Sequence, residues 1–412
     1  MSSTGPLAVG EAVREFYEAH PYPAPITDLA RHRELYRNPQ RRRVLSHMFW
    51  PARPPRPNRD ILVAGCGTSQ AATYALSEPD ARVTGIDISE RSLDLTRALQ
   101  EKYAIGNLAL HRLPVEGVGE LGCKFDQIVC TGVLHHLPDP DAGLRALREV
   151  LLPAGAVHLM VYAAYGRAGI YMLQAYCRIL GVRPSEGELR DLDVVIGMLP
   201  SGHPISALAT RAKDFREPDA LADSLLHPQD RAYTVPELHG WLESAGMVFG
   251  RWFEQAPYSA RCGIVANMPH GSLLTSLPTK LQHAAVELFR GTMTTHSFIA
   301  YRDDYPDEPQ PIGVAGEAWR DYIPLRLPWT ICIRDRVPPG FAAVLVNRAH
   351  THADLALPID AVEERLYLAI DGSRSTGEIC RDFAEAGDEE QARKLFQRLW
   401  ENDQIVFDAT GK

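Results

Sequence analysis

The feature that most constrains this chain is a short apolar run that leads directly into glycines and then into a helical pattern. The run is Ile61-Leu-Val-Ala-Gly-Cys-Gly-Thr68. Glycines at such a turn let the backbone fold tightly and let its N–H groups approach a ligand. A second run, 82–86, ends in Asp87, whose carboxylate can accept hydrogen bonds from both hydroxyls of a ribose. The pattern predicts a parallel α/β sheet that binds a nucleotide-type cofactor at the carboxyl ends of its strands.

Three further apolar runs extend this pattern, and helical patterns lie between most of the five runs. Short apolar strands that alternate with helices indicate parallel pairing with both faces of the sheet covered. We therefore expect an α/β fold with a doubly wound, mostly parallel, seven-stranded sheet, a helical cap, and an antiparallel hairpin at one edge. The expected strands are 60–64, 82–86, 108–111, 125–130 and 156–162, the hairpin is 247–253 and 262–266, and the helices are 71–76, 89–103 and 141–152.

The glycine loop also discriminates between cofactors. Residues 65–70 lack the third glycine of a GxGxxG dinucleotide fingerprint, and no GK[ST] follows a glycine loop anywhere in the sequence. A pyrophosphate requires the close approach of the helix that this third glycine allows. S-adenosylmethionine carries no phosphate, so its site tolerates a bulkier turn, and the loop favours this cofactor.

The segment from Ile61 to Tyr162 resembles the core of class I S-adenosylmethionine-dependent methyltransferases. Its matching pieces are VAGCG at 63–67, GIDIS at 85–89, FDQIV at 125–129, GVLHHLP at 132–138 and LPAG at 152–155. The resemblance implies an enzyme that transfers a methyl group in line from a sulfonium to a nucleophile, mainly by holding the two atoms together. The sequence departs from the family where Val63 replaces the usual acid and Ser69 the usual third glycine.

The resemblance also assigns positions around the cofactor. The glycines would wrap its methionine part, and Asp87 would hold the ribose. The segment after the third strand would contact the adenine, and the end of the fourth strand would lie beside the methionyl group. The expected cofactor-binding residues are Tyr17, Tyr22, Ala64, Gly65, Cys66, Gly67, Gln70, Asp87, Ile88, Arg112, Leu113 and Thr131.

The N-terminal Phe16-Tyr-Glu-Ala-His-Pro-Tyr-Pro23 resembles an element that folds over the cofactor in a subset of the family. Tyr17 and Tyr22 would then flank the sulfonium, because a positive charge is attracted to aromatic faces. The alternative is a proline-stiffened arm that only packs its aromatic side chains on the domain.

Candidate residues for the methyl acceptor follow the fourth and fifth strands. His135 and His136 are expected at the carboxyl edge of the sheet, where a histidine can take a proton near neutral pH. A purely structural role for both is the alternative. His227, Tyr233 and His296 are expected to be satisfied core or surface residues, and ligand spacing indicates no metal. The expected substrate wall is Tyr162, Tyr165, Arg167 and Tyr171.

Composition divides the chain into four parts. Residues 1–59 are expected to form an N-terminal arm over the cofactor, 60–270 the core with a cap insertion at 163–230, 271–319 a linker region, and 320–412 a C-terminal accessory module. The arm carries nine arginines between Arg31 and Arg59, which form either a solvated surface or an attraction for an acidic substrate. Because the glycine loop lies far upstream, we expect a chain that ends near residue 310 to bind the cofactor.

The accessory module is expected to contain three short helices and a strand. Its segment 370–379 resembles small winged-helix peptide-recognition modules. Residues 341–412 have eight basic and fourteen acidic side chains, an acidic balance that argues against DNA binding. The expected core of the module is Leu366, Leu368, Ile370, Ile379, Phe383, Leu395, Phe396, Leu399 and Ile405.

Charge and cysteine usage restrict the remaining possibilities. The net charge of −9 argues against nucleic acid as a partner, and no apolar stretch approaches the roughly 20 residues of a membrane span. Seven scattered cysteines and the lack of a signal-type N-terminus predict a cytoplasmic protein. Three functions stay open. The first is methylation of an O or N nucleophile on a small metabolite or natural-product intermediate, and the second is methylation of a peptide or protein side chain recognised by the accessory module. The third is a non-catalytic cofactor-binding or interaction protein.

Overall fold

The computed structural model describes residues 6–206, 208, 215–306, 312–314, 316–382 and 389–411. The chain divides into two compact units, and each is built from three separate stretches of sequence. The core unit consists of residues 1–33, 58–249 and 290–305. The accessory unit consists of residues 34–57, 250–289 and 306–412.

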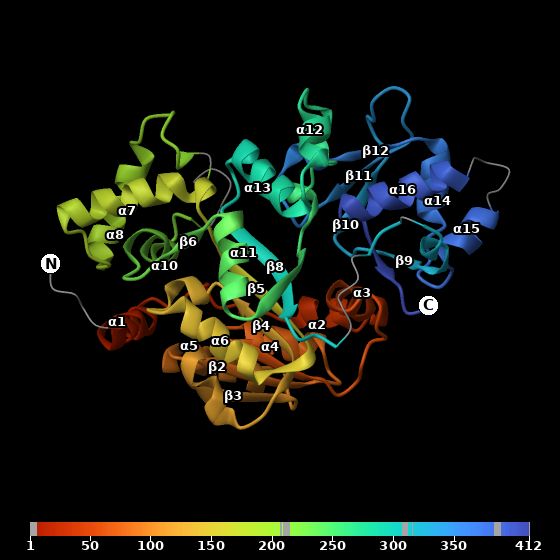
Figure 1. Cartoon of the computed structure of the whole chain (residues 1–412). Helices are drawn as coiled ribbons and strands as arrows, with labels where there is room; N and C mark the ends of the chain where they lie inside the picture. The colour runs from red at the N-terminus through yellow and green to blue at the C-terminus, as the bar shows by residue number, and fades with distance from the viewer. Residues whose placement is uncertain are drawn as a thin grey trace. The chain divides into compact units, whose positions relative to one another are not determined.

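A large mixed sheet forms the centre of the core unit, with strand order β3-β2-β1-β4-β5-β8-β7 and a two-residue strand, β6, beside β5 (Figure 1). The first five strands pair in parallel, and β8 pairs antiparallel to β5. The predicted doubly wound, mostly parallel α/β sheet is therefore confirmed. The strands are β1 (Asp60–Ala64), β2 (Arg82–Asp87), β3 (Leu108–Arg112), β4 (Phe125–Thr131), β5 (Leu151–Ala163), β6 (Ala232–Tyr233), β7 (Met247–Trp252) and β8 (Thr295–Arg302).

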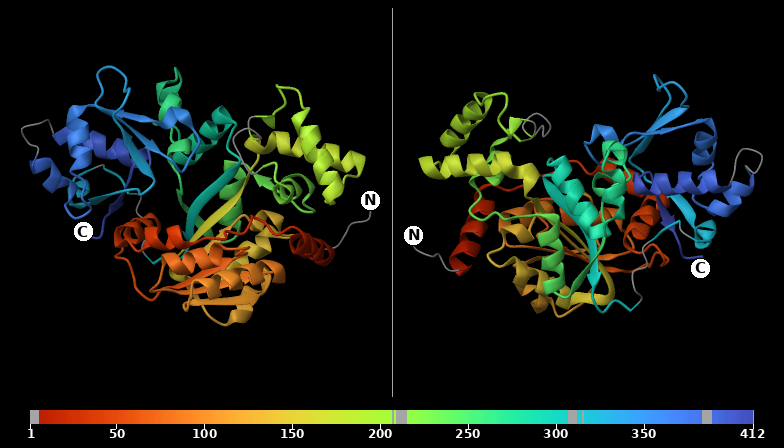
Figure 2. Two further views of the ribbon diagram at one scale, coloured as in Figure 1. Left: turned by 180° about the vertical axis from the view of Figure 1, so that it is seen from behind. Right: turned by 45° about the horizontal axis from the view of Figure 1, so that its top comes forward.

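Helices cover both faces of this sheet. The helix α11 lies in front of the sheet in Figure 1, whereas α4 comes to the front when the molecule is seen from behind (Figure 2). Small residues of α4 and leucines of α5 pack with Ile61 and Val63 of β1 in one apolar cluster. Ser89 begins α5, where its hydroxyl accepts a hydrogen bond from the N–H of Ser92. The helices are α4 (Gln70–Ser77), α5 (Glu90–Lys102), α6 (Pro140–Val150) and α11 (Val235–Ser244).

A helical cap follows β5 and includes the first helix of the chain. Its apolar cluster contains Phe16 of α1 together with Leu173 and Leu192 of the helices after β5. The N-terminal arm is thus anchored in the cap by its own aromatic side chain. The cap elements are α1 (Pro6–Ala19), α7 (Ala168–Leu180), α8 (Glu186–Gly197), α10 (Pro218–Leu221) and the π-helical turn Ala222–Leu226.

The accessory unit has an apolar core of its own. Three helices and a final strand follow one another at its C-terminal end, as the sequence predicted, and two small sheets accompany them. The helices are α3 (Pro39–Phe49), α12 (Gly271–Ser276), α13 (Thr279–Arg290), α14 (Ala361–Leu368), α15 (Thr376–Asp382) and α16 (Glu389–Glu401), while α2 (Ala30–Tyr36) spans the boundary between the units. The strands are β9 (Ile323–Arg326), β10 (Thr330–Ile333), β11 (Ala343–Asn347), β12 (Leu357–Ile359) and β13 (Ile405–Asp408).

Three expectations about boundaries differ from the structure. The region 271–319, predicted as a linker, contains α12, α13 and β8, and β8 lies in the central sheet because its apolar residues pair along β5. The second strand of the predicted hairpin, 262–266, is a 3-10 turn, so β7 pairs with β8 instead. Residues 34–57 of the predicted arm belong to the accessory unit, since α3 contacts β13 there.

Candidate functional site

The glycine loop after β1 has the backbone conformation that its sequence predicts. Gly65 and Gly67 have φ angles of +65° and +54°, which other residues rarely adopt. A Cβ atom at Gly65 would lie 2.3 Å from Cγ2 of Val133. The N–H of Cys66 donates to the carbonyl of Ile86 at 2.9 Å. The loop is therefore held closely against β2 and the segment that follows β4.

Asp87 holds this loop from the end of β2. Its Oδ2 accepts a hydrogen bond from the N–H of Gly67 at 2.8 Å, and its Oδ1 accepts one from the N–H of Ser89 at 2.9 Å. Burial raises the pKa of the Asp87 carboxyl, while these backbone hydrogen bonds oppose the rise. An ionised carboxylate has about four acceptor positions, so two engaged N–H groups leave room for further donors.

The other predicted cofactor residues lie at the same edge of the sheet. The amide Nε2 of Gln70 donates to Oγ1 of Thr131 at 2.7 Å and so joins the start of α4 to the end of β4. The N–H of Leu113 donates to the carbonyl of Asp87 at 3.0 Å, and Nε of Arg112 donates to the carbonyl of Ile88 at 3.3 Å. Ala64 ends β1 and is fully buried. Residues chosen from motif and spacing are thus brought together from four strands.

The N-terminal arm passes over the glycine loop. The carbonyl oxygen of Tyr22 lies 3.6 Å from the position that a Cβ of Gly67 would occupy. The hydroxyl of Thr68 donates to the carbonyl of Pro23 at 2.8 Å. The carboxylate of Glu18 accepts the N–H of Glu90 at 2.8 Å, at the start of α5. These contacts fix the arm across the predicted cofactor edge.

A buried polar cluster lies beside the arm and centres on Asp223, which the sequence analysis did not single out. Asp223 is 2% exposed and sits on the π-helical turn of the cap. Its two carboxylate oxygens accept hydrogen bonds from the hydroxyls of Tyr17, at 3.0 Å, and Tyr162, at 3.2 Å. Burial raises the pKa of Asp223. Tyr17 therefore reaches from the arm into the cap and contacts Asp223 there. The sequence motifs do not predict this contact.

The backbone of Gln229 sets the protonation of two histidines in this cluster. Nδ1 of His136 lies 2.7 Å from the carbonyl oxygen of Gln229, so Nδ1 carries the proton and Nε2 keeps a free lone pair. The N–H of Gln229 donates to Nδ1 of His227 at 3.0 Å, so the neutral His227 carries its proton on Nε2. The two rings lie 3.9 Å apart between centroids. The pair thus combines a proton acceptor and a proton donor.

His135 differs from its neighbour. It is fully buried and packs on the ring of Tyr162 at a centroid distance of 3.8 Å. Within the described part of the chain, neither of its ring nitrogens has a hydrogen-bond partner. Burial, with smaller contributions from His136, Arg167 and His227, holds its pKa well below the usual value. These surroundings favour a packing role for His135.

The same cluster offers three atoms that resemble a metal-ligand set. Single donor atoms of His136, Asp223 and His227 all lie within 4.8 Å of one another. Two histidines and a carboxylate can hold a divalent cation when each ring presents a lone pair. His136 fits, but the N–H of Gln229 occupies Nδ1 of His227 and leaves a proton on its Nε2. The arrangement suits hydrogen bonding to an organic group better than coordination of a metal.

Two of the four predicted substrate residues contact a second buried carboxylate, Asp230, and a third packs on one of these two. Its oxygens contact Nη2 of Arg167 at 3.2 Å and the hydroxyl of Tyr171 at 3.3 Å. The guanidinium of Arg167 also lies 3.4 Å from the centre of the Tyr162 ring. The fourth residue, Tyr165, is 41% exposed and does not share this environment.

The three remaining polar residues from the sequence analysis have different surroundings. His296 is fully buried, and its Nε2 lies 3.0 Å from the carbonyl oxygen of Tyr233, as expected of satisfied core residues. Tyr233 is also fully buried, but its hydroxyl has no hydrogen-bond partner among the described residues, against the expectation. His227 belongs to the polar cluster instead. Nothing in the sequence around His227 predicts this, because the contact depends on how the cap packs on the edge of the sheet.

Comparisons with known proteins agree with this geometry. Residues 62–157 match the family model described as a methyltransferase domain. The chain is 34% identical over 258 residues to the uncharacterized protein syc1184_c of a Synechococcus strain, covering 59% of this chain and 60% of that protein. It is 29% identical over 100 residues to the ubiquinone biosynthesis O-methyltransferase of Acinetobacter baylyi, covering 24% of this chain and 42% of that enzyme. The chain thus spans less than two thirds of these relatives.

A solved structure shares the fold over most of the chain. PKMT2 from Rickettsia typhi, in complex with AdoHcy, superposes with a TM-score of 0.63 at 14% identity, over 90% of this chain and 75% of that one. Residues 62–157 therefore match a methyltransferase domain, as the motifs predicted, and the chain shares the fold of a structure that was solved with AdoHcy bound. In the part of the chain that the structure describes, no helix is long and apolar enough to cross a membrane.

Proposed function

We propose that the protein transfers a methyl group from S-adenosylmethionine to an oxygen or nitrogen nucleophile of a small metabolite or natural-product intermediate. The observation that carries this proposal is the position of α1. Its residue Glu18 binds the start of α5 beside the cofactor edge, and its residue Tyr17 binds Asp223 in the buried polar cluster. One helix therefore joins the predicted cofactor edge to a set of groups that can handle a proton.

The cofactor edge supplies contacts of the right kind. The cofactor, when bound, provides an electrophilic methyl group on its sulfonium. The free acceptor positions of Asp87 would bind ribose hydroxyls. Gln70 and Thr131 close the loop on the side of β4. The arm residues Tyr22 and Pro23 cover the loop and would exclude water from it.

His136 is the residue we assign to proton transfer. Its Nε2 has a free lone pair because its Nδ1 proton is bound to a backbone carbonyl. The Nε2 proton of His227 can donate to a second polar atom of the acceptor. The carboxylate of Asp223 lies within the same cluster and stabilises the imidazolium that forms when His136 takes up a proton. His135 lacks these partners and is not needed for this step.

Two measurements on the full chain test the proposal. Calorimetric titration with S-adenosylmethionine must show binding, and its absence would favour a non-catalytic interaction protein. Transfer of a labelled methyl group to panels of small polar metabolites and of peptides then identifies the acceptor class. Transfer to peptides alone would replace the small-molecule assignment.

Variants of the histidines test the mechanism once an acceptor is known. His136→Gln is expected to lower turnover by roughly 100-fold or more and leave cofactor binding intact, because it removes a general base. His135→Gln and the exposed surface control His270→Gln are expected to lower turnover far less. Turnover of His136→Gln within a few-fold of the parent protein would refute its assignment.

A further inference from the structure

The accessory unit contains a pocket of about 370 Å³ that the proposed methyl transfer does not use. It lies between the start of α3, the strand β9 with its following turn, and the end of α14. All its walls come from the same unit of the chain. Leu325, Ile370 and Val44 give it an apolar, buried base, and its lining also includes two arginines and a tyrosine.

Two guanidinium groups in this lining have no acidic partner among the described residues. Arg41, on the first turn of α3, and Arg326, at the end of β9, form no ion pair or side-chain hydrogen bond with any described residue. The guanidinium carbon of Arg326 lies 5.5 Å from the centre of the Tyr367 ring. Arginines in such a position present several N–H donors that have no acceptor in the protein.

The tyrosine in the lining also lacks a partner. Tyr367 is 3% exposed, yet its hydroxyl has no hydrogen-bond partner among the residues that the structure describes. Because Tyr367 lines the pocket, a bound molecule can supply that partner. The hydroxyl oxygen itself is accessible from the pocket, so it offers a donor to a polar guest.

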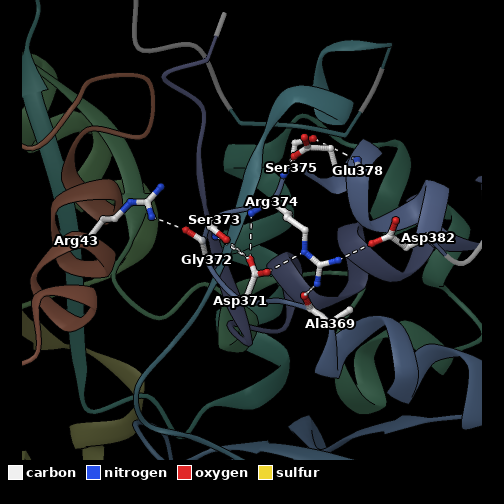
Figure 3. A network of polar contacts seen from close by, with 9 residues as sticks. All are labelled: Arg43, Ala369, Asp371, Gly372, Ser373, Arg374, Ser375, Glu378 and Asp382. Carbon is white, nitrogen blue, oxygen red and sulfur yellow. Dashed lines mark hydrogen bonds and ion pairs between the residues drawn. The ribbon is translucent and has the colours of Figure 1, made fainter.

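The acid at the rim does not neutralise the arginines. Asp371 accepts hydrogen bonds from the N–H groups of Ser373, at 2.8 Å, and Arg374, at 3.0 Å, and from Nε of Arg374 at 2.7 Å (Figure 3). Although partial burial opposes it, these hydrogen bonds hold the pKa of Asp371 well below its usual range. Its carboxylate is thus committed to its own loop.

The other charged groups near the rim are paired as well. Figure 3 shows the guanidinium of Arg374 between Asp371, Asp382 and the carbonyl oxygen of Ala369, and its nitrogens lie 2.7, 2.6 and 2.8 Å from these three acceptors. Arg43 of α3 points toward the carbonyl oxygen of Gly372 and also binds Asp408. The network fixes the rim and leaves the positive charges of Arg41 and Arg326 for a ligand.

We propose that this pocket binds an organic anion, namely a carboxylate or a phosphate group attached to an apolar body. Arg41 and Arg326 would bind the oxyanion, because guanidinium groups match its geometry and charge. Tyr367 would donate its hydroxyl proton to the same group. The apolar body would cover Leu325 and Ile370. This ligand site is separate from the cofactor edge of the core unit, and it does not depend on methyl transfer.

Calorimetric titration of the full chain with simple probes tests the site. Phenylacetate and phenyl phosphate carry the two candidate oxyanions, phenylacetamide is the neutral analogue, and inorganic phosphate lacks the apolar body. At least one of the aromatic anions is expected to bind at least about tenfold more tightly than the amide, since a charge-assisted contact contributes roughly 1.5–3 kcal/mol. Comparison of the two anions identifies the preferred oxyanion.

Variants locate the binding. Arg41→Gln and Arg326→Gln are each expected to weaken the preferred anion by about tenfold, and Tyr367→Phe by a few-fold. Arg348→Gln is the matched control, because Arg348 is an exposed arginine of the same unit that does not line the pocket. Circular dichroism and thermal unfolding verify that each variant is folded.

Four results would overturn the proposal. They are no binding of either aromatic anion at about 10 mM, equal binding of phenylacetamide, binding of inorganic phosphate as tight as that of phenyl phosphate, and affinities of both Arg41→Gln and Arg326→Gln that equal that of the Arg348→Gln control. The first two exclude an anion site, the third excludes a role for the apolar base, and the fourth places the binding elsewhere.

Discussion

Asp87 shows how one side chain can serve both the fold and the ligand. It holds the N–H groups of Gly67 and Ser89 and still has acceptor positions for ribose. Asp87→Ala is expected to lower the affinity for S-adenosylmethionine by at least about tenfold, because the lost charge-assisted hydrogen bonds contribute roughly 1.5–3 kcal/mol. Calorimetric titration measures this change. Asp94→Ala removes an exposed carboxylate of α5 and is the control.

An unchanged dissociation constant for Asp87→Ala would remove the ribose assignment. The variant must be folded for this conclusion, because Asp87→Ala also removes the hydrogen bond that holds the glycine loop. The thermal unfolding temperature, measured without cofactor, separates a loss of ligand contacts from a loss of loop structure.

Asp403 makes a prediction about stability and pH. Burial, opposed by Arg251, raises its pKa to about 7, and burial also raises that of Glu254 to about 7. Unfolded carboxyl groups titrate near about 4, so the folded protein binds more protons between these values. Stability is therefore expected to decrease as the pH rises from about 4 to about 7, and to level off above that.

Asp403→Asn tests this expectation, because it keeps an acceptor for the N–H of Ala256 but cannot ionise. Thermal unfolding between pH 5 and pH 8 should show a smaller loss of stability in this variant than in the parent protein. The exposed Asp335→Asn serves as the control. Parallel pH profiles for Asp403→Asn and the parent would contradict the assigned pKa.

At the scale of residues, the sequence predicted the cofactor edge, but it predicted the buried polar cluster around Asp223 only in part. Gly65, Gly67 and Asp87 are determined by local turn geometry and strand spacing, which the sequence displays. Asp223 and His227 lie on or next to a π-helical turn, far from β4 and the arm in sequence. Their roles arise only when the cap packs beside the sheet, and no periodicity records such a contact.

At the scale of elements, α3 and β13 form a pair that sequence reading did not join. Nη2 of Arg43 lies 2.6 Å from the carboxylate of Asp408, and Nε2 of His47 lies 3.3 Å from it. Burial opposes the ionisation of Asp408, but the close approach of the His47 ring and the hydrogen bond from Arg43 outweigh it and hold the pKa of Asp408 well below its usual range. The ion cluster thus attaches an early helix to the last strand.

Asp408→Asn is expected to destabilise the protein by roughly 1.5–3 kcal/mol at pH 7, the usual contribution of charge-assisted hydrogen bonds. A carboxyl group with a lowered pKa stabilises the fold above its unfolded pKa and loses this effect as the pH falls. Denaturant unfolding should therefore show a difference from the parent that shrinks below about pH 4. A difference that stays constant down to the lowest pH would show that charge is not its origin.

Element prediction was accurate where the apolar period is strong. In α16, Leu395, Phe396 and Leu399 are buried as expected. Leu368 was predicted in the core but is 47% exposed, whereas its neighbours Leu366 and Tyr367 in the last turn of α14 are buried. Phe383 lies outside the described residues. The strand β8 was missed because its polar ends, Thr295 and Arg302, conceal a short buried run.

For the whole molecule, the interleaving of the two units matters most. The accessory unit needs α3 and residues 250–289 as well as the C-terminal third of the chain. The N–H of Ala256 donates to Asp403 at 2.7 Å, and the amide of Gln255 donates to the carbonyl of Trp400 at 2.6 Å. Removal of residues after 310 would expose these segments.

A chain that ends at residue 310 is therefore expected to aggregate, in contrast to what the sequence suggested. Size-exclusion chromatography and titration with S-adenosylmethionine check this. Co-expression of residues 306–412 should restore soluble, cofactor-binding protein, because it returns the missing partners of α3. A monomeric truncated chain with the cofactor affinity of the full chain would contradict this prediction.

The attachment of α3 to β13 also has a consequence for biosynthesis. Arg43 and Asp408 are separated by 365 positions. At roughly 5–20 residues per second, a ribosome needs about 20–70 s to make the intervening chain. Throughout that interval the nascent polypeptide carries Val44, Met48 and Phe49, which are buried in the finished protein, without their final strand. A codon change that slows translation of the last hundred residues would lengthen this exposure and raise the demand for a chaperone that holds the N-terminal region.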